Sequence, residues 1–173
     1  MWWYEMQKIN QNNEKTLKVD DFIVSKTDMK GKILYGNKTF IKISGYSEKE
    51  LLGAPHSILR HPDMPKIVFY FLWERIKIKQ EIFAYVKNLC KDGSYYWVFA
   101  NVTASLDDHG NIRDFHSVRR KPSDKALKII PEIYAKLLKA ENSGGMEASK
   151  ALLNKILDEQ GVSYDTFVLS LQQ

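Results

Sequence analysis

Two strand-like segments on either side of a tight turn constrain the fold of this chain most strongly. Residues 82–90 and 95–104 alternate in side-chain character, and the turn sequence Lys91-Asp92-Gly93-Ser94 separates them. A period of two over segments of this length predicts β-strands, and an Asp-Gly turn is typical of a hairpin. The inward faces are expected to carry Ile82, Ala84, Val86, Asn88 and Cys90 on the first strand, and Tyr96, Val98, Ala100, Val102 and Ala104 on the second.

Further strands and short helices complete an α+β pattern. Residues 22–27 and 32–36 predict a second hairpin, and residues 112 to about 120 predict a last strand. Between the hairpins, Asn37 and Ser47 are expected to cap short helices, followed by a longer helix from about Met64 to Ile78. The last of these is apolar over more than half its circumference, so it is expected to be buried on two sides. The predicted fold is a five-stranded antiparallel sheet with short helices on one face.

The chain of 173 residues is expected to form one domain with two appendages. We predict an N-terminal arm at residues 1–19, the sheet domain at 20–122, and a C-terminal helical extension at 123–173. The arm carries Trp2 and Trp3, whose side chains are expected to dock on the same domain or on a second subunit.

Composition restricts the classes of function. The chain is 44% apolar and 27% charged, as soluble globular proteins are, and it has no apolar run long enough for membrane insertion and no signal-peptide pattern. A cytoplasmic protein is expected. The densest basic run, Arg119-Arg120-Lys121, is interpreted as solvated surface, with contact to an acidic partner or to phospholipid head groups as the alternative. Nucleic-acid binding is not expected because no aromatic-interleaved basic strip is present. A single cysteine, Cys90, excludes an internal disulfide and a cysteine metal cluster.

The inward faces of the long hairpin indicate a pocket. Asn88 has apolar neighbours on its face, and a buried amide requires both a donor and an acceptor. A ligand edge or neighbouring backbone could supply them. Ala84, Ala100 and Ala104 are small for a filled core, so either a ligand or large helix residues such as Trp73 must occupy the remaining volume.

Several motifs together resemble a PAS sensor domain over about residues 20–122. They are Asn37-Lys38-Thr39-Phe40, Ser44-Gly45-Tyr46, Arg60-His61-Pro62-Asp63-Met64-Pro65 and Lys91-Asp92-Gly93-Ser94-Tyr95-Tyr96-Trp97-Val98. The Arg60–Pro65 segment is the most specific and resembles the FAD-binding PAS domains of bacterial aerotaxis receptors. Only about fifty residues follow the domain, which is similar to stand-alone PAS proteins of bipartite energy-taxis systems. The resemblance implies a redox sensor that signals by contact with a separate membrane chemoreceptor of the methyl-accepting type, and a homodimer stays open.

The resemblance also implies the residues of an FAD site. Asn88 would bond the pyrimidine edge of the flavin, and Trp73 would pack on the ring or belong to the core. Arg60, His61 and Asp63 would bind the pyrophosphate and adenine side, although Asp63 could instead cap the next helix in a self-satisfied turn. The full implied set is Asn37, Arg60, His61, Asp63, Phe69, Trp73, Asn88 and Tyr96.

Other cofactors and functions are weaker predictions. A light-sensing flavin domain of the LOV type needs a cysteine within residues 56–61, and none is present there. Heme would need an axial histidine, for which His56, His61, His109 or His116 could serve. A cofactor-free interaction module is a further alternative. A small flavin oxidoreductase is not expected, because the sequence has neither a nicotinamide fingerprint nor a nucleophile with a matched base.

Overall fold

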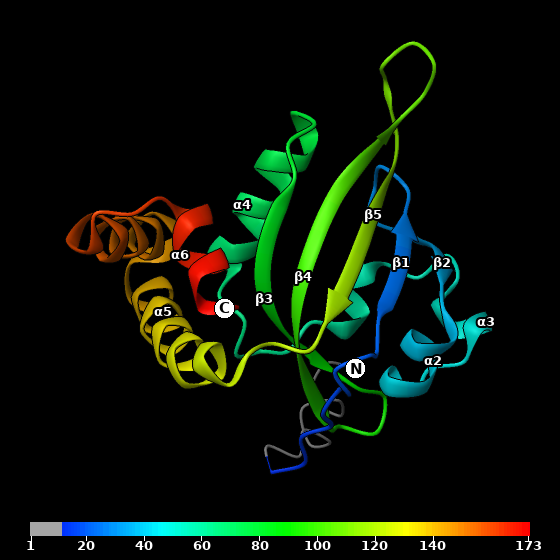
Figure 1. The fold of residues 1–173 in the computed structure, drawn as a ribbon, viewed down its shortest axis with the longest axis horizontal. Helices are drawn as coiled ribbons and strands as arrows, with labels where there is room; N and C mark the ends of the chain where they lie inside the picture. The colour runs from blue at the N-terminus through cyan, green and yellow to red at the C-terminus, as the bar shows by residue number, and fades with distance from the viewer. Residues whose placement is uncertain (1–11) are drawn as a thin grey trace.

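The alternating segments form one antiparallel sheet, as predicted. The computed structural model describes residues 12–173, and the strand order across the sheet is β2-β1-β5-β4-β3 (Figure 1). The strands are β1 (Ile23–Thr27), β2 (Ile33–Gly36), β3 (Ile82–Leu89), β4 (Tyr95–Leu106) and β5 (Ile112–Arg120). In the β3–β4 hairpin, Ala84 lies opposite Ala100 and Asn88 opposite Tyr96. The predicted α+β fold class is confirmed.

Short helices connect the two hairpins across the inner face of the sheet. They are α2 (Lys38–Ser44), α3 (Glu48–Leu51), the 3₁₀ helix η2 (His56–Leu59) and α4 (Lys66–Lys77). Asn37 caps α2 by accepting from the Phe40 amide, and Ser47 and Glu50 form a capping box at α3. Both predicted caps are therefore confirmed.

Of the two roles considered for Asp63, the helix cap is not found at the start of α4. Asp63 does not cap it; Pro65 occupies the N-cap position and provides no side-chain hydrogen bond. The carboxylate of Glu141, far along the chain, accepts from the Lys66 amide at 2.9 Å. A carboxylate there also stabilises the positive end of the helix dipole. The start of α4 is consequently tied to the C-terminal helices.

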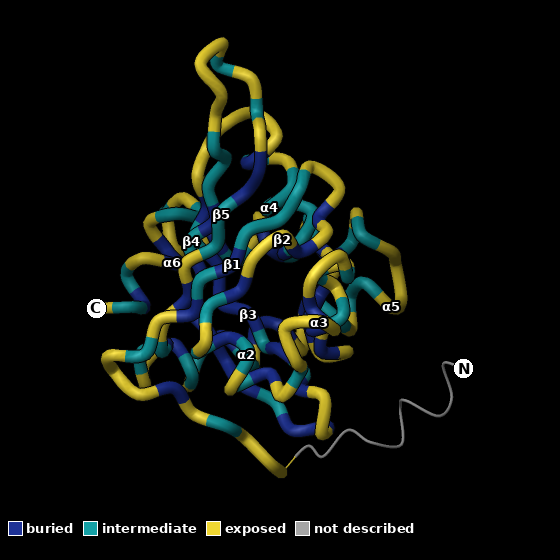
Figure 2. Tube along the Cα trace, turned by 90° about the vertical axis from the view of Figure 1, so that its right-hand side faces the viewer, coloured by how far each residue is buried: buried dark blue, intermediate teal, exposed yellow. Residues whose placement is uncertain are grey.

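Two C-terminal helices cover the outer face of β3 and β4. They are α5 (Asp124–Gln160), which is broken at Gly145 (φ 74°, ψ −172°), and α6 (Tyr164–Leu171). The Tyr134 hydroxyl on α5 donates to the Tyr85 carbonyl at 2.7 Å, and the Tyr85 hydroxyl donates to the Val168 carbonyl on α6 at 3.0 Å. Buried residues follow the strands and the helix faces turned toward them, whereas loops and outer helix faces are exposed (Figure 2).

The described end of the N-terminal arm pairs with the sheet domain. The Lys15 amide donates to the Tyr95 carbonyl at 2.7 Å, the Tyr95 amide donates to the Asn13 carbonyl at 3.1 Å, and Leu17 is buried. The predicted docking of Trp2 and Trp3 falls outside the described residues. Within residues 12–173, no helix has the length and apolarity needed to cross a membrane.

The Tyr85 hydroxyl provides a test of how the C-terminal helices pack. Tyr85→Phe is expected to lower the free energy of unfolding by about 1–3 kcal/mol, because it leaves the Val168 carbonyl without this buried donor. Urea denaturation would measure the change. Tyr35→Phe is the matched control, since Tyr35 is 45% exposed on β2. Equal stability of the Tyr85→Phe protein and the control would contradict the described packing.

Candidate functional site

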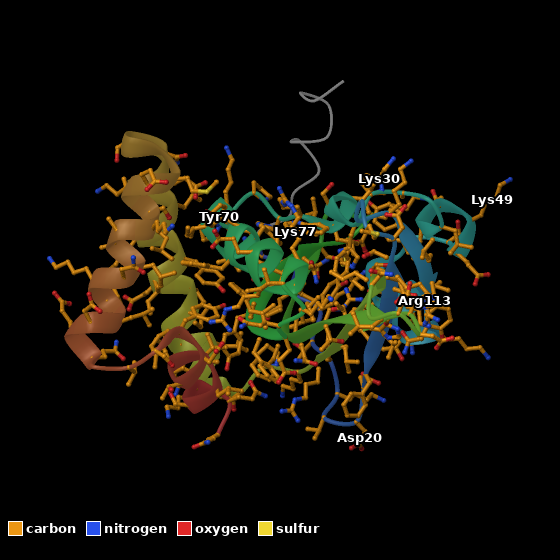
Figure 3. All side chains as sticks on the ribbon, turned by 90° about the horizontal axis from the view of Figure 1, so that it is seen from above. Asp20, Lys30, Lys49, Tyr70, Lys77 and Arg113 are labelled. Carbon is orange, nitrogen blue, oxygen red and sulfur yellow. The ribbon has the colours of Figure 1, made fainter. Side chains whose placement is uncertain are left out.

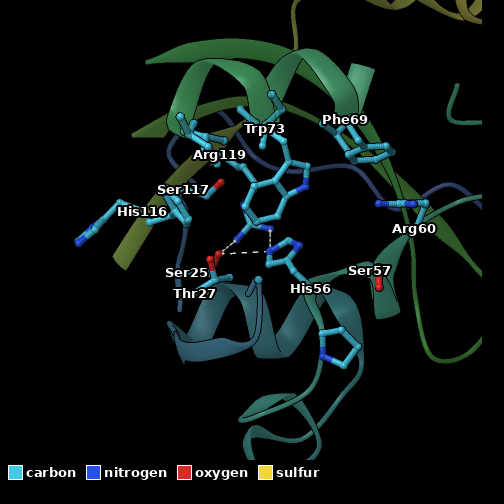
Figure 4. Close-up of a pocket in the computed structure, with 18 of the residues that line it drawn as sticks. Ser25, Thr27, His56, Ser57, Arg60, Phe69, Trp73, His116, Ser117 and Arg119 are labelled. Atoms are coloured by element: carbon cyan, nitrogen blue, oxygen red, sulfur yellow. Dashed lines mark hydrogen bonds between the residues drawn. The ribbon is translucent and has the colours of Figure 1, made fainter. Parts of the chain in front are cut away.

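A cavity of about 290 Å³ lies between α4 and the inner face of the sheet (Figure 4). Its volume is close to the lower end of the range for small-molecule pockets, roughly 300–1,000 Å³. Helix α4 contributes Phe69, Leu72, Trp73 and Ile76. The sheet contributes, among others, Ser25, Val86, Asn88, Ala100, Val102, Phe115 and Arg119, and η2 contributes His56 and Ser57.

Aromatic and small side chains shape the apolar walls. The Trp73 indole meets the Phe115 ring edge to face at 5.6 Å between ring centroids. It also lies against Gly31 (φ 79°), where a Cβ atom would come within 3.3 Å of the indole. Of the three alanines of the hairpin, only Ala100 lines the cavity; Ala84 is fully buried, and Ala104 packs against an apolar cluster that shares Ile76, Val102 and Phe115 with the cavity wall.

Four of the predicted site residues line this cavity: Arg60, Phe69, Trp73 and Asn88. Asn88 is 4% exposed, and its Nδ2 atom has no hydrogen-bond partner among the described residues. The backbone of Arg60 forms an isolated antiparallel bridge with Asn88, and the Arg60 guanidinium, beside Ser57, lies 4.1 Å from the centroid of the Phe69 ring (Figure 4). The sequence prediction thus identified one polar group at the sheet and one at the cavity rim.

Asn37, another residue of the predicted site, does not line this cavity. Its Oδ1 atom accepts from the Val24 and Phe40 amides at 3.2 and 3.0 Å, and its Nδ2 atom donates to the Phe22 carbonyl at 2.8 Å. The side chain is fully used in joining β1 to α2.

His61 and Asp63 also lie outside the cavity lining, and the buried His61 Nε2 atom has no hydrogen-bond partner among the described residues. The Asp63 amide donates to His61 Nδ1 at 3.1 Å, and the Asp63 carboxylate pairs with Lys87 Nζ at 2.7 Å. Burial and the nearby Lys87 charge lower the pKa of His61 to about 4, so its ring is neutral at pH 7. Tyr96 is fully buried opposite Asn88 but is not part of the lining, and burial raises the pKa of its hydroxyl.

The sequence interpretation missed a polar cluster at the β1–β5 end of the cavity. Arg119 is 2% exposed; its guanidinium donates to Ser25 Oγ and lies 3.4 Å from His56 Nε2. Burial, together with the Arg119 charge, lowers the pKa of His56 to about 3, so the ring is neutral. The basic run at 119–121 is therefore not uniformly surface. Strand alternation from the buried Phe115 would have placed Arg119 inside.

These features suit a flat aromatic ligand with a hydrogen-bond-accepting edge. Two buried donors of the cavity wall, Asn88 Nδ2 and Arg119 Nε, have no partner among the described residues, and buried polar atoms normally have one. The Cys90 thiol is directed elsewhere, toward the Ile43 carbonyl at 3.2 Å. In the described part of the chain, no cluster of three or more His, Cys, Asp or Glu side chains could hold a metal ion.

Known proteins resemble more than half of this chain. It is 37% identical to the aerotaxis receptor of Escherichia coli (strain K12) over 125 residues, which cover 72% of this chain and 24% of the receptor. It is 26% identical to the nitrogen fixation regulatory protein of Klebsiella pneumoniae over 97 residues, covering 56% of this chain and 20% of that protein. The chain therefore spans a quarter or less of the length of these relatives.

Solved structures and a family model agree with the observed fold. The light-state LOV domain of the blue-light photoreceptor Aureochrome1 matches with a TM-score of 0.53 and 26% identity, over 71% of this chain and 91% of that one. A light-oxygen-voltage domain studied with a flavin analogue matches with a TM-score of 0.56 and 24% identity, over 64% and 83% of the two chains. The family model described as the PAS fold matches residues 33–119, and the chain belongs to the PAS family.

Proposed function

We propose that this protein is an FAD-binding PAS redox sensor for energy taxis. The observation that carries the proposal is the pair of buried donors, Asn88 Nδ2 and Arg119 Nε, on the wall of an aromatic-lined cavity. The similarity to an aerotaxis receptor and to a domain studied with a flavin analogue supports a flavin as the ligand.

The residues present fit the ring of a flavin. The ring would lie beside Trp73 and over Val86 and Ala100, and Asn88 would donate to its pyrimidine edge. Arg60, at the rim, would bind the phosphate side of the cofactor, because a guanidinium suits phosphate oxygens. When bound, the flavin supplies reversible electron uptake. The protein would hold and orient it, and the apolar walls would limit the access of water.

Helix α4 would carry a change in the cavity to the C-terminal helices. One side of α4 lines the cavity through Phe69, Trp73 and Ile76. The other side contacts the C-terminal layer: the Lys66 amide donates to Glu141, and Arg75 pairs with Asp165 at 2.8 Å. Tyr70 lies on that side as well, where Lys150 of α5 is 5.3 Å from its ring centroid (Figure 3).

We further propose that the output is contact rather than turnover. The partner would be a separate membrane chemoreceptor with a methyl-accepting signalling domain, docked on the C-terminal helices from the cytoplasmic side. Such a contact reports the flavin state only if the receptor has different affinities for the oxidised and reduced protein.

Cavity filling tests the place of the cofactor. The purified protein is expected to show flavin absorption and to release FAD on denaturation. Ala100→Leu should lower flavin affinity by about tenfold or more, because the added methyl groups enter the ring space. Reconstitution followed by fluorescence quenching would measure the affinity, and chromatography would distinguish FAD from FMN.

Ala135→Leu on the exposed face of α5 is the matched control and should bind like the wild type. A colourless wild-type protein that also fails to bind added FAD would overturn the proposed function.

The Asn88 amide has a separate test. Asn88→Leu is expected to weaken flavin binding by about tenfold, or 1.4 kcal/mol, through loss of one donor in a buried site. Isothermal titration of the apo protein would measure this. Asn101→Leu serves as a control, since Asn101 bonds Glu81 outside the cavity at 3.1 Å. Unchanged affinity in the Asn88 variant would remove this residue from the site.

The coupling role of α4 predicts where reduction alters the dynamics. Amide hydrogen exchange, compared between oxidised and dithionite-reduced holoprotein, should change in α4 and in the part of α5 around Glu141. Helix α3, which does not line the cavity, is the internal control. Exchange changes confined to the strands would show that α4 does not couple the cavity to the C-terminal helices.

A further inference from the structure

Arg119 is a buried cation without a buried anion. It is 2% exposed, and none of the ion pairs found within residues 12–173 includes it. Its pKa is lowered to about 10 by burial, so it remains charged at neutral pH. Burying a charge without a countercharge is costly, and proteins rarely retain such a group without compensation.

The neighbours of Arg119 orient the guanidinium without neutralising it. Ser25 accepts one hydrogen bond, and His56 is neutral because its pKa is about 3. The Phe40 ring centroid lies 4.7 Å from the guanidinium carbon, which gives a cation–π contact. The Nε atom has no partner within the described chain. The group is therefore held in place with its charge available.

The charge is directed at one end of the cavity. Arg119 lies beside Trp73 on the side opposite Arg60, together with Ser25 and His56 (Figure 4). Arg60 is exposed, so water screens its charge, whereas Arg119 is buried and its charge is screened less. The two arginines would consequently affect a ligand differently. Arg60 would bind the part of the ligand at the rim, and the charge of Arg119 would act on the buried ring.

We infer that Arg119 sets the redox range of the sensor by stabilising the reduced, anionic form of the bound flavin more than the oxidised form. This inference rests on the proposed function. When bound, the flavin would take up two electrons from an electron donor such as dithionite, together with one proton, and would then carry one negative charge. Arg119 transfers no proton; it is a positioning charge that favours the electron-rich state, so it raises the midpoint potential.

The midpoint potential of the holoprotein tests this inference. Spectroelectrochemical titration with dithionite and mediators should show that Arg119→Gln weakens binding of the reduced flavin, relative to the oxidised flavin, by about tenfold. For a two-electron couple, that is a fall in potential of about 30 mV. Arg119→Lys keeps the charge and should restore most of the wild-type potential.

Arg120→Gln is the matched control, because Arg120 is the next residue on β5 and points to the exposed side. Its potential should equal that of the wild type. The melting temperatures of the apo proteins show whether Arg119 is needed for the stability of the fold. The apo Arg119→Gln and Arg119→Met proteins should be as stable as the wild type or more so, because they remove an unpaired buried charge.

Two failures are distinguishable. If the wild-type protein binds no flavin, both the proposed function and this inference are wrong. If the wild type binds flavin and the Arg119→Gln potential is unchanged, only this inference is overturned. Apo Arg119→Gln and Arg119→Met proteins that are strongly destabilised or do not fold would make Arg119 a structural residue, which also overturns it.

Discussion

The register of the β3–β4 hairpin is the constraint on which the rest of the structure depends. With Ala84 opposite Ala100 and Asn88 opposite Tyr96, one set of side chains faces α4 and the alternate set faces α5 and α6. A slip of one residue would exchange the two sets. The same pairing therefore places the Asn88 amide on the cavity and the Tyr85 hydroxyl under the C-terminal helices.

Helix α4 depends on that register on both of its sides. On one side, α4 faces the cavity opposite small residues such as Ala100. On the other side, Glu141 of α5 accepts a hydrogen bond from the first turn of α4, and Asp165 of α6 pairs with Arg75. Partly exposed contacts of this kind contribute only about 0.5–1 kcal/mol each. A complete switch from 1:99 to 99:1 requires about 5.5 kcal/mol, so these contacts suit a graded response.

The strands, the Asn37 and Ser47 caps and the facing of Asn88 and Trp73 were predictable, because each follows from periodicity or from capping within a few residues. The cap of α4 was not, since its acceptor Glu141 lies 75 residues away. Arg119 was misinterpreted because a run of basic residues is typical of surface, and here strand alternation outweighs composition. In the turn, the Asp63 amide donates to His61 and the Asp63 carboxylate pairs with Lys87 on β3, and a family motif alone does not reveal that pairing.

The buried cation links the ligand to the stability of the fold. Without a countercharge, Arg119 lowers the stability of the empty protein, while Ser25, Phe40 and the surrounding apolar core hold the chain in its fold. A ligand that binds only the folded state adds stability in proportion to the logarithm of its concentration over its dissociation constant. An electron-rich ligand relieves the unpaired charge as well. The ligand state whose negative charge best balances the Arg119 charge would therefore also give the folded cavity, including α4, its greatest stability.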